Sequence, residues 1–263
     1  MDLGIEDNAA LVTASSSGLG RASAAALVEA GANVVVNGRD EDRLAETVAD
    51  LRELDGGEVV GQPADITDAD EVAALVETAV DEFGGLDHLV TSAGGPPSGA
   101  FLATTERDWY EAYDLLVMSV VRLVWESAEH LRAGDGGTIV NVTSRSVKEA
   151  IDSLVLSNSV RMSVIGLEKT LSKELAPEVR VNAVLPGAHE TARIEELVEQ
   201  GVERGEYDSY EEGIADWGKD NPMERVGDPR ELGDVVAFLS SERASFVNGV
   251  SLLVDGGESA GNI

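Results

Sequence analysis

Short apolar runs alternate along the chain with longer, Ala-rich segments in which apolar residues recur every three or four positions. The short runs are apolar at consecutive positions, which is typical of parallel strands covered on both faces. They predict strands at Ala9–Thr13, Asn33–Asn37, Glu58–Gln62, His88–Thr91, Thr138–Thr143, Arg180–Leu185 and Ser251–Val254. The longer segments predict helices near 19–30, 40–54, 68–84, 105–132, 157–176 and 228–241. This alternation predicts an α/β fold with a single doubly wound parallel sheet, helices on both faces, and a ligand site at the carboxyl ends of the strands.

One stretch, at about 188–227, breaks this alternation. It is rich in charged residues and contains Tyr207, Tyr210 and Trp217. Plain connections between helices and strands are much shorter, so we predict that this insertion forms short helices that act as a lid over the site. The chain shows no internal repeat and no linker, which predicts a single domain over residues 1–263.

The net charge of the chain limits the environments and the partners that we expect for it. Asp and Glu number 50 against 19 Lys and Arg, which gives a net charge of −31. The acidic residues are spread along the chain, as on a solvated acidic surface rather than in a disordered tail. Such a surface repels nucleic acid and anionic membranes, so we expect neither as a partner. It is typical of a halophilic protein in a salt-rich cytoplasm, where ions screen the repulsion.

Other features exclude several kinds of protein. The sequence has no Cys, so neither disulfides nor thiolate metal sites are available. Its three His residues, at positions 88, 130 and 189, lack the spacing of metal ligands, and we expect no metal. No apolar run approaches the roughly 20 residues of a membrane helix, and the first residues do not resemble a secretory signal. We therefore expect a cytoplasmic protein.

A turn of small residues follows the first predicted strand. Thr13-Ala14-Ser15-Ser16-Ser17-Gly18-Leu19-Gly20 leads from that strand into a helix. Glycines in such a turn let the backbone approach a pyrophosphate, whose charge suits the N-terminus of the helix. A tight turn in any α/β protein uses similar residues, so this motif alone leaves both interpretations open.

The end of the second predicted strand favours a dinucleotide and indicates which one. An acidic residue here would bind the ribose of NAD, but Gly38 occupies the position and Arg39 follows it. An arginine suits the 2′-phosphate of NADP. The alternative is an exposed arginine that pairs with Asp40 or Asp42. We predict NADP(H) as the preferred cofactor and keep NAD(H) as the other option.

The chain resembles the short-chain dehydrogenase/reductase family, whose fold is Rossmann-like. The family's Thr-Gly-x-x-x-Gly-x-Gly has its counterpart in the turn that begins at Thr13, with Ala14 in place of the first glycine. An Asp after the third strand, an Ala-Gly pair after the fourth, and a Pro-Gly segment followed by a Thr also have counterparts. The resemblance implies that the cofactor is bound by Thr13, Ser15, Ser17, Gly18, Leu19, Gly20, Arg39, Asp65, Ile66, Ala93, Gly94, Arg161, Pro186, Gly187 and Thr191.

The catalytic end departs from the family. There, a Ser hydrogen-bonds the substrate oxygen, a Tyr thirteen positions later passes the proton, and a Lys four further on lowers the pKa of the Tyr. Ser144 matches the Ser, but Ser157 and Arg161 take the Tyr and Lys positions, and Leu116 replaces a supporting Asn. A serine hydroxyl does not replace a phenol of pKa near ~10 as a proton donor. Arg161 stays protonated, so it is suited to binding ribose or polarising a carbonyl but not to relaying a proton.

An enzyme with these replacements needs another proton donor. Our candidate is His189, three residues after Pro186, because the pKa of histidine suits proton transfer. The alternative is a histidine in a surface loop. Tyr207 and Tyr210 are further candidates, although aromatic residues in a lid more often serve packing.

Two cations follow the matched serine, in a segment that borders the substrate in the family. Arg145 and Lys148 stand out in a chain with few basic residues, and with Arg161 they suggest an anionic substrate group such as a carboxylate. The alternative is a pair of salt bridges to the neighbouring Glu149 and Asp152.

We therefore expect an NADP(H)-dependent oxidoreductase that acts on a small carbonyl or hydroxyl compound, with a keto or hydroxy acid as one option and with an atypical proton donor. The alternative is a non-catalytic NADP(H)-binding sensor or an inactive subunit. Members of the family usually form tetramers, so the resemblance also implies a homotetramer.

Overall fold

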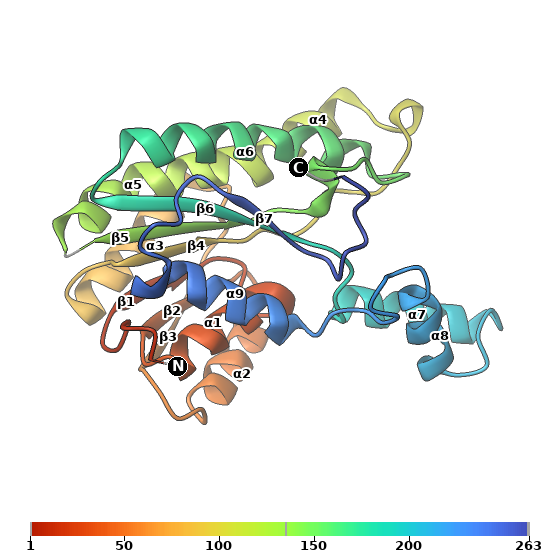
Figure 1. The fold of residues 1–263 in the computed structure, drawn as a ribbon, viewed down its shortest axis with the longest axis horizontal. Coiled ribbons are helices and arrows are strands. Elements are labelled where there is room, and N and C mark those ends of the chain that lie inside the picture. Colours follow the sequence, from red (N-terminus) through yellow and green to blue (C-terminus); the bar gives the residue numbers. More distant parts are fainter. Residues whose placement is uncertain (1, 135, 262–263) are drawn as a thin grey trace.

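The computed structural model describes residues 2–134 and 136–261. Seven parallel strands form one sheet in the order β3-β2-β1-β4-β5-β6-β7, with helices on both faces (Figure 1). The strands are β1 (Ala9–Val12), β2 (Asn33–Gly38), β3 (Val59–Pro63), β4 (His88–Thr91), β5 (Gly137–Val142), β6 (Val179–Pro186) and β7 (Ser251–Val254). The predicted fold class is confirmed, and the predicted strand boundaries differ from the observed ones by at most one residue.

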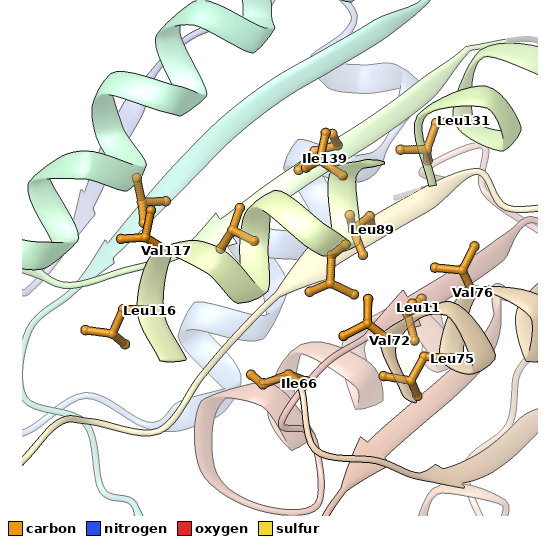
Figure 2. Close-up of a cluster of buried hydrophobic side chains, with 14 of the residues drawn as sticks. Leu11, Ile66, Val72, Leu75, Val76, Leu89, Leu116, Val117, Leu131 and Ile139 are labelled. Atoms are coloured by element: carbon orange, nitrogen blue, oxygen red, sulfur yellow. The ribbon is translucent and has the colours of Figure 1, made fainter. Parts of the chain in front are cut away.

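The helices form two layers. One layer consists of α1 (Gly18–Glu29), α2 (Glu41–Leu51) and α9 (Pro229–Ser240), and the other of α3 (Ala69–Phe83), α5 (Ser119–Ala133) and α6 (Val155–Glu174). Alternate strand residues face opposite layers: Leu11, Leu89 and Ile139 pack beneath the second layer (Figure 2), while Val12 and Val90 pack beneath the first. Burial on both faces is why the strands are apolar at consecutive positions.

The helix predicted at 105–132 is divided in the structure. It consists of α4 (Glu106–Tyr113), a π-helical turn (Asp114–Met118) and α5. Such turns carry one extra residue and are frequent at functional sites. Leu116, in this turn, is buried in the core, where it packs with the side chains shown in Figure 2.

The insertion at 188–227 contains two short helices, α7 (Ala192–Glu203) and α8 (Tyr210–Gly218), which lie beside each other at the right of Figure 1. Its two ends meet, because the Gly227 N–H donates to the Ala188 carbonyl at 2.9 Å and the Glu190 N–H donates to the Gly227 carbonyl at 2.8 Å. The insertion therefore begins and ends at one point, between the end of β6 and the start of α9.

Three single turns of 3₁₀ helix complete the secondary structure, at Phe101–Ala103, Arg145–Val147 and Glu242–Ala244. None of the helices within residues 2–134 and 136–261 combines the length and the apolar character that crossing a bilayer requires.

Candidate active site

A cleft of about 610 Å³ opens at the carboxyl ends of the strands, where the strand order reverses between β1 and β4. A reversal of this kind leaves a crevice because the connections on its two sides run to opposite faces of the sheet. Its lining includes Ser16, Ser17, Gly18, Leu19, Gly20, Arg39, Arg43, Asp65, Ile66, Ala93, Gly94, Leu115, Val142, Thr143, Arg161 and Thr191. The fold thus brings together most of the residues that the resemblance assigns to the cofactor.

Thr13 and Ser15 hold the turn after β1 in place. Both are fully buried. Thr13 Oγ1 donates to the Ser92 carbonyl at 2.8 Å and accepts from the Ser92 N–H at 2.9 Å. Ser15 Oγ donates to the Val12 carbonyl at 2.6 Å and accepts from the Asn37 N–H at 2.8 Å. We therefore assign these two side chains a supporting role instead of the expected contact with a cofactor.

Asn37, which the sequence pattern did not single out, organises the same turn. Its Oδ1 accepts from the Ala14 N–H at 3.1 Å, and its Nδ2 donates to the carbonyls of Gln62 and Ala64 at 3.2 and 3.0 Å. The amide thus connects the turn to the ends of β2 and β3. The available signal was a single amide at the end of a buried apolar strand, because such a group requires hydrogen-bond partners.

The turn requires glycine at one position and accepts its loss at another. A Cβ on Gly20 would lie 2.4 Å from the Ala14 carbonyl oxygen, so α1 can begin this close to the turn only with glycine there. Ala14 has a φ of 47°, a left-handed conformation that costs a non-glycine residue roughly 1–2 kcal/mol. The hydrogen bond from the Ala14 N–H to Asn37 offsets part of this cost.

Two arginines stand at the outer end of the cleft, after β2. The Arg39 side chain is 80% exposed, and its Nη1 lies 3.8 Å from Asp65 Oδ2, a long ion pair that leaves the guanidinium accessible. Asp40 caps α2 and pairs with Arg43 at 2.9 Å, so Arg39 does not use it. Arg43 is a lining residue that we did not predict; it lies in the first turn of α2.

The neighbouring groups define what this outer end can bind. A Cβ on Gly38 would lie 2.5 Å from Ser16 Oγ, so an acidic side chain at this position would require Ser16 to move. Asp65 accepts hydrogen bonds from the Thr67 N–H at 2.9 Å and the Thr67 hydroxyl at 2.8 Å. These bonds, with Arg39 nearby, hold the pKa of the Asp65 carboxyl below its usual value, so it is ionised at neutral pH.

Three serines are connected next to Thr143, which lines the inner end of the cleft, although none of the three is itself a lining residue. Ser144 Oγ accepts from the Ser146 N–H at 3.1 Å, and the Ser146 and Ser157 hydroxyls lie 3.2 Å apart in a buried contact. Ser146 was not among the predicted residues. Ser157, which the spacing predicts at the family's Tyr position, is a buried hydroxyl held by another hydroxyl. Thr143, the residue before Ser144, lines the cleft.

Arg161 also lies at the inner end, one turn after Ser157 in α6. It is only 8% exposed, and its Nε has no hydrogen-bond partner among the described residues. Burial lowers the pKa of Arg161 to about 10, which still leaves it a cation at neutral pH. A buried charge without a partner is unfavourable by several kcal/mol.

His189 is neither in a surface loop nor part of this cleft lining. It is 4% exposed, and its Nδ1 lies 3.1 Å from the Gly187 carbonyl oxygen. Together with Arg225, Glu231 and other residues it lines a separate cavity of about 210 Å³. Burial is the main cause that lowers the pKa of its imidazole. The expectation of a proton donor beside the cofactor therefore has no geometric basis in this structure.

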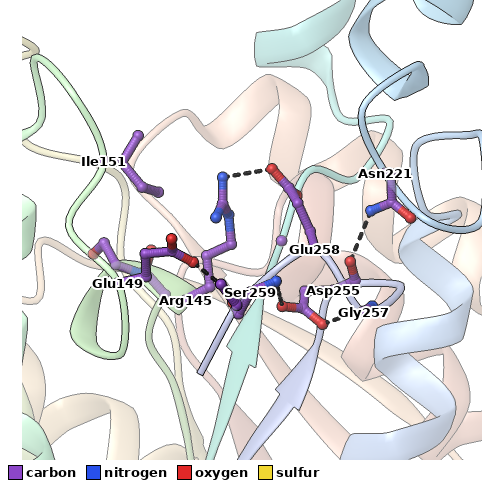
Figure 3. Close-up of polar contacts among 12 residues, drawn as sticks. Arg145, Glu149, Ile151, Asn221, Asp255, Gly257, Glu258 and Ser259 are labelled. Carbon is purple, nitrogen blue, oxygen red and sulfur yellow. Dashed lines mark hydrogen bonds and ion pairs between the residues drawn. The ribbon is translucent and has the colours of Figure 1, made fainter. Parts of the chain in front are cut away.

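The two cations after Ser144, Arg145 and Lys148, lie in different surroundings. Arg145 forms an ion pair with Glu258 at 2.6 Å, in the C-terminal segment (Figure 3), rather than with Glu149 or Asp152. The Glu149 carboxylate instead accepts from the Ala260 N–H at 3.1 Å. The C-terminal segment thus occupies Arg145, which we no longer regard as a group for a substrate anion.

Lys148, by contrast, is exposed and is not among the residues that line the cofactor cleft.

The two tyrosines of the insertion are held by its own residues. The Tyr210 hydroxyl donates to Glu190 at 2.8 Å, and burial together with this carboxylate raises the pKa of Tyr210 to about 12. The Tyr207 hydroxyl donates to Asp216 at 3.4 Å. Neither lines the cleft, which agrees with the packing alternative.

The remaining predicted residues lie around the junction of β6 and the insertion. Pro186 ends β6, and the Gly187 N–H donates to the Val254 carbonyl at 3.0 Å. Thr191 begins α7 and lines the cleft, so the insertion borders the site at that residue.

Comparisons with known proteins agree with this geometry. The chain matches the family model described as Enoyl-(Acyl carrier protein) reductase over residues 13–259. It is 30% identical over 262 residues to the uncharacterized oxidoreductase YvrD of Bacillus subtilis, with 98% of each chain covered. It is 31% identical over 255 residues to the 3-oxoacyl-[acyl-carrier-protein] reductase FabG of Staphylococcus aureus, covering 94% of this chain and 96% of that protein.

The fold is also close to that of a solved reductase. The L-sorbose reductase of Gluconobacter frateurii, solved with NADPH and L-sorbose, superposes with a TM-score of 0.94 at 30% identity and covers 99% of this chain and 100% of that one. The cleft at the strand reversal and these matches over nearly the whole chain lead to one conclusion. The chain belongs to the short-chain dehydrogenase/reductase family.

Proposed function

We propose that the protein is an NADP(H)-dependent oxidoreductase that interconverts a small carbonyl compound and its alcohol. One observation carries the proposal: a single cleft extends from Arg39 and Arg43 at its outer end to Thr143 and Arg161 at its inner end. It therefore offers cationic groups for a phosphorylated cofactor at one end and a position beside Ser144 for a substrate at the other.

The side chains present fit a nicotinamide dinucleotide. The N-terminus of α1 has no side-chain cap, so its free N–H groups suit a pyrophosphate. Asp65 and Ile66 would border the adenine, and Arg39 and Arg43 would bind the 2′-phosphate of NADP. Bound NADPH would supply the hydride. The similar L-sorbose reductase binds NADPH, which supports this choice over NAD(H).

Ser144 would bind the substrate oxygen. Its Oγ accepts a hydrogen bond from the Ser146 N–H, so its own proton remains available for donation to a carbonyl. Ser157 and Arg161 are unsuited to deliver the proton that completes the reduction, and His189 lines another cavity. We therefore propose that water, entering through the open cleft, is the atypical proton donor.

The second candidate function is a non-catalytic NADP(H)-binding sensor or an inactive subunit. It is favoured by the inner end of the cleft, where Ser157 is paired with Ser146 and Leu116 is buried in the core. These residues replace the family's Tyr and Asn, and neither offers a titratable group.

NADPH binding and NADPH consumption separate the two candidates. Binding is measured by the change in NADPH fluorescence, and consumption is followed with keto acids, sugar-derived ketones and β-keto esters in molar KCl. The enzyme requires consumption that Ser144→Ala abolishes while NADPH still binds. NADPH binding without consumption across the panel would favour the sensor or inactive subunit.

We also propose that the protein is a halophilic, cytoplasmic homotetramer. Trp125 on α5 is 71% exposed and Met162 on α6 is 48% exposed, while Phe246 and Leu252 are exposed near β7. Such apolar side chains suit contacts between subunits. Light scattering should give four times the mass of one chain. The melting temperature should rise steeply from low to molar KCl, because ions screen a net charge of −31.

A further inference from the structure

The guanidinium of Arg161 has no counterion among the described residues. The side chain is nine-tenths buried, its Nε makes no hydrogen bond, and no described carboxylate lies within ion-pair distance. Taking an ionised group out of water is unfavourable unless an anion compensates for it. Because Arg161 lines the cofactor cleft, a ligand in that cleft is the available source of an anion.

A bound dinucleotide alone would not supply the compensation. The family's Lys at this position holds the ribose of the nicotinamide, and ribose hydroxyls are neutral acceptors. They would satisfy N–H donors of Arg161 but would leave its charge unpaired. The phosphates suit the N-terminus of α1 and the two arginines after β2, at the other end of the cleft.

The surroundings of Arg161 restrict the anion to the substrate position. Leu115, Val142 and Thr143 line the same end of the cleft. Ser157 contacts the segment that follows Thr143, and Arg161 stands one turn further along α6, a rise of roughly 6 Å. Arg161 and the segment of Ser144 therefore belong to the same end of the cleft, where one small molecule can present an anion to Arg161 and its reacting oxygen to Ser144.

We infer that the substrate is a small 2-oxo acid, or the corresponding 2-hydroxy acid, whose carboxylate binds Arg161 while its reacting oxygen faces Ser144. This inference rests on the proposed function. A planar guanidinium matches a carboxylate through two parallel hydrogen bonds. In the reduction, the hydride of NADPH forms the new C–H bond, a proton from water forms the O–H bond, and NADPH is oxidised to NADP⁺.

The test compares oxamate with oxamide on the NADPH-loaded protein. The two molecules share the same framework, but oxamide has a neutral amide where oxamate has its carboxylate. Fluorescence titration in molar KCl should give oxamate a dissociation constant at least about 10-fold lower than that of oxamide. Arg161→Gln should remove this preference, and Arg145→Gln should keep it because Arg145 already pairs with Glu258. Equal binding of the two probes, or a preference that survives Arg161→Gln, would overturn the inference.

A second measurement does not depend on a ligand. If Arg161 serves a ligand rather than the fold, Arg161→Met should raise the melting temperature of the unliganded protein, because it removes a buried charge without a partner. A fall in melting temperature with loss of folded signal would show a structural role and overturn the inference. Failure of the proposed function looks different: the wild-type protein would then fail to bind NADPH, or would bind it and oxidise none in the presence of any carbonyl compound.

Discussion

The outer and inner ends of the cleft depart from the family pattern in different ways. At the outer end, Ala14 replaces a glycine, and the amide of Asn37 holds its strained backbone. At the inner end, Ser157 and Leu116 are accommodated by burial, but the charge of Arg161 is left without a partner among the described residues.

The two ends differ in whether their buried polar groups find hydrogen-bond partners within the protein. The outer end is a network of hydrogen bonds among Thr13, Ser15 and Asn37 that is complete within the protein, so it is preorganised for a ligand of fixed shape. At the inner end, the buried guanidinium of Arg161 keeps an unpaired Nε among the described residues. We therefore expect substitutions at the outer end to change cofactor affinity, and substitutions at the inner end to change turnover and substrate choice.

The largest effect should come from the core that the two ends share. His88, at the start of β4, is buried between Asn8 and Thr138, and burial lowers its pKa from 6.5 to about 3. The folded protein therefore binds fewer protons than the unfolded one. The stability from neutral His88 is complete above pH ~6.5 and is lost as the pH falls toward 3, by roughly 5 kcal/mol at most.

Urea unfolding between pH 7 and pH 4 checks this expectation. His88→Asn should flatten the fall in stability, while His130→Asn, on α5, should leave it unchanged. NADPH binding and turnover should disappear together in acid if one core supports both ends. Loss of one activity well before the other would contradict a shared core.

At the inner end, Ser144→Ala should lower kcat at least about 100-fold, because it removes the hydrogen bond to the reacting oxygen. The dissociation constant of NADPH should change less than about 2-fold, since the proposed role of Ser144 is to bind the substrate oxygen and not the cofactor. Steady-state kinetics and fluorescence titration give the two values. Ser245→Ala, at an exposed position, is the matched control. Weaker NADPH binding with unchanged kcat would reverse the assignment of the two ends.

At the outer end, Arg39→Ala and Arg43→Ala should each weaken NADPH binding about 10-fold, or 1.4 kcal/mol, by removing a contact to the 2′-phosphate. NADH binding should be unaffected, because NADH lacks that phosphate. Arg107→Ala, an arginine that pairs with Glu111 on the surface, is the control. A wild-type protein that binds NADPH and NADH equally well would remove the role of both arginines.

The smallest expected effect is a gain in turnover. Restoring the family residues with Ser157→Tyr and Arg161→Lys should raise turnover of neutral ketones a few-fold to about 10-fold, because a phenol can deliver the proton. Arg161→Lys alone should give no gain. Circular dichroism must show that the double variant is folded, since Ser157 is only 7% exposed. A folded double variant without any gain would mean that the inner end lacks more than a proton donor.

Sequence patterns were sufficient to predict most of the strands and helices of this molecule. The consecutive apolar positions of β1 and β2 predicted buried parallel strands, and the break in alternation at 188–227 predicted short helices there. The division of the helix at 105–132 was not predicted, because a π-helical turn changes no hydrophobic period over so few residues.

The site was predictable only where a motif is local. The turn that begins at Thr13 and the position of Arg39 follow from neighbouring residues in the chain. The partner of Arg145 does not, because Glu258 lies 113 positions away and pairs with it only after the C-terminal segment has folded back (Figure 3). For the same reason, the alternative predicted from the sequence, pairing with the neighbouring Glu149 and Asp152, is not what the structure shows for Arg145.

The sequence by itself determined the doubly wound fold and the position of the cleft, because periodicity and spacing are local properties of the chain. Tertiary structure decided which polar groups have partners. Packing gave Thr13 and Ser15 supporting roles, placed His189 at another cavity and left Arg161 buried without a counterion among the described residues. Burial and pairing depend on segments distant in sequence, and no local pattern specifies them.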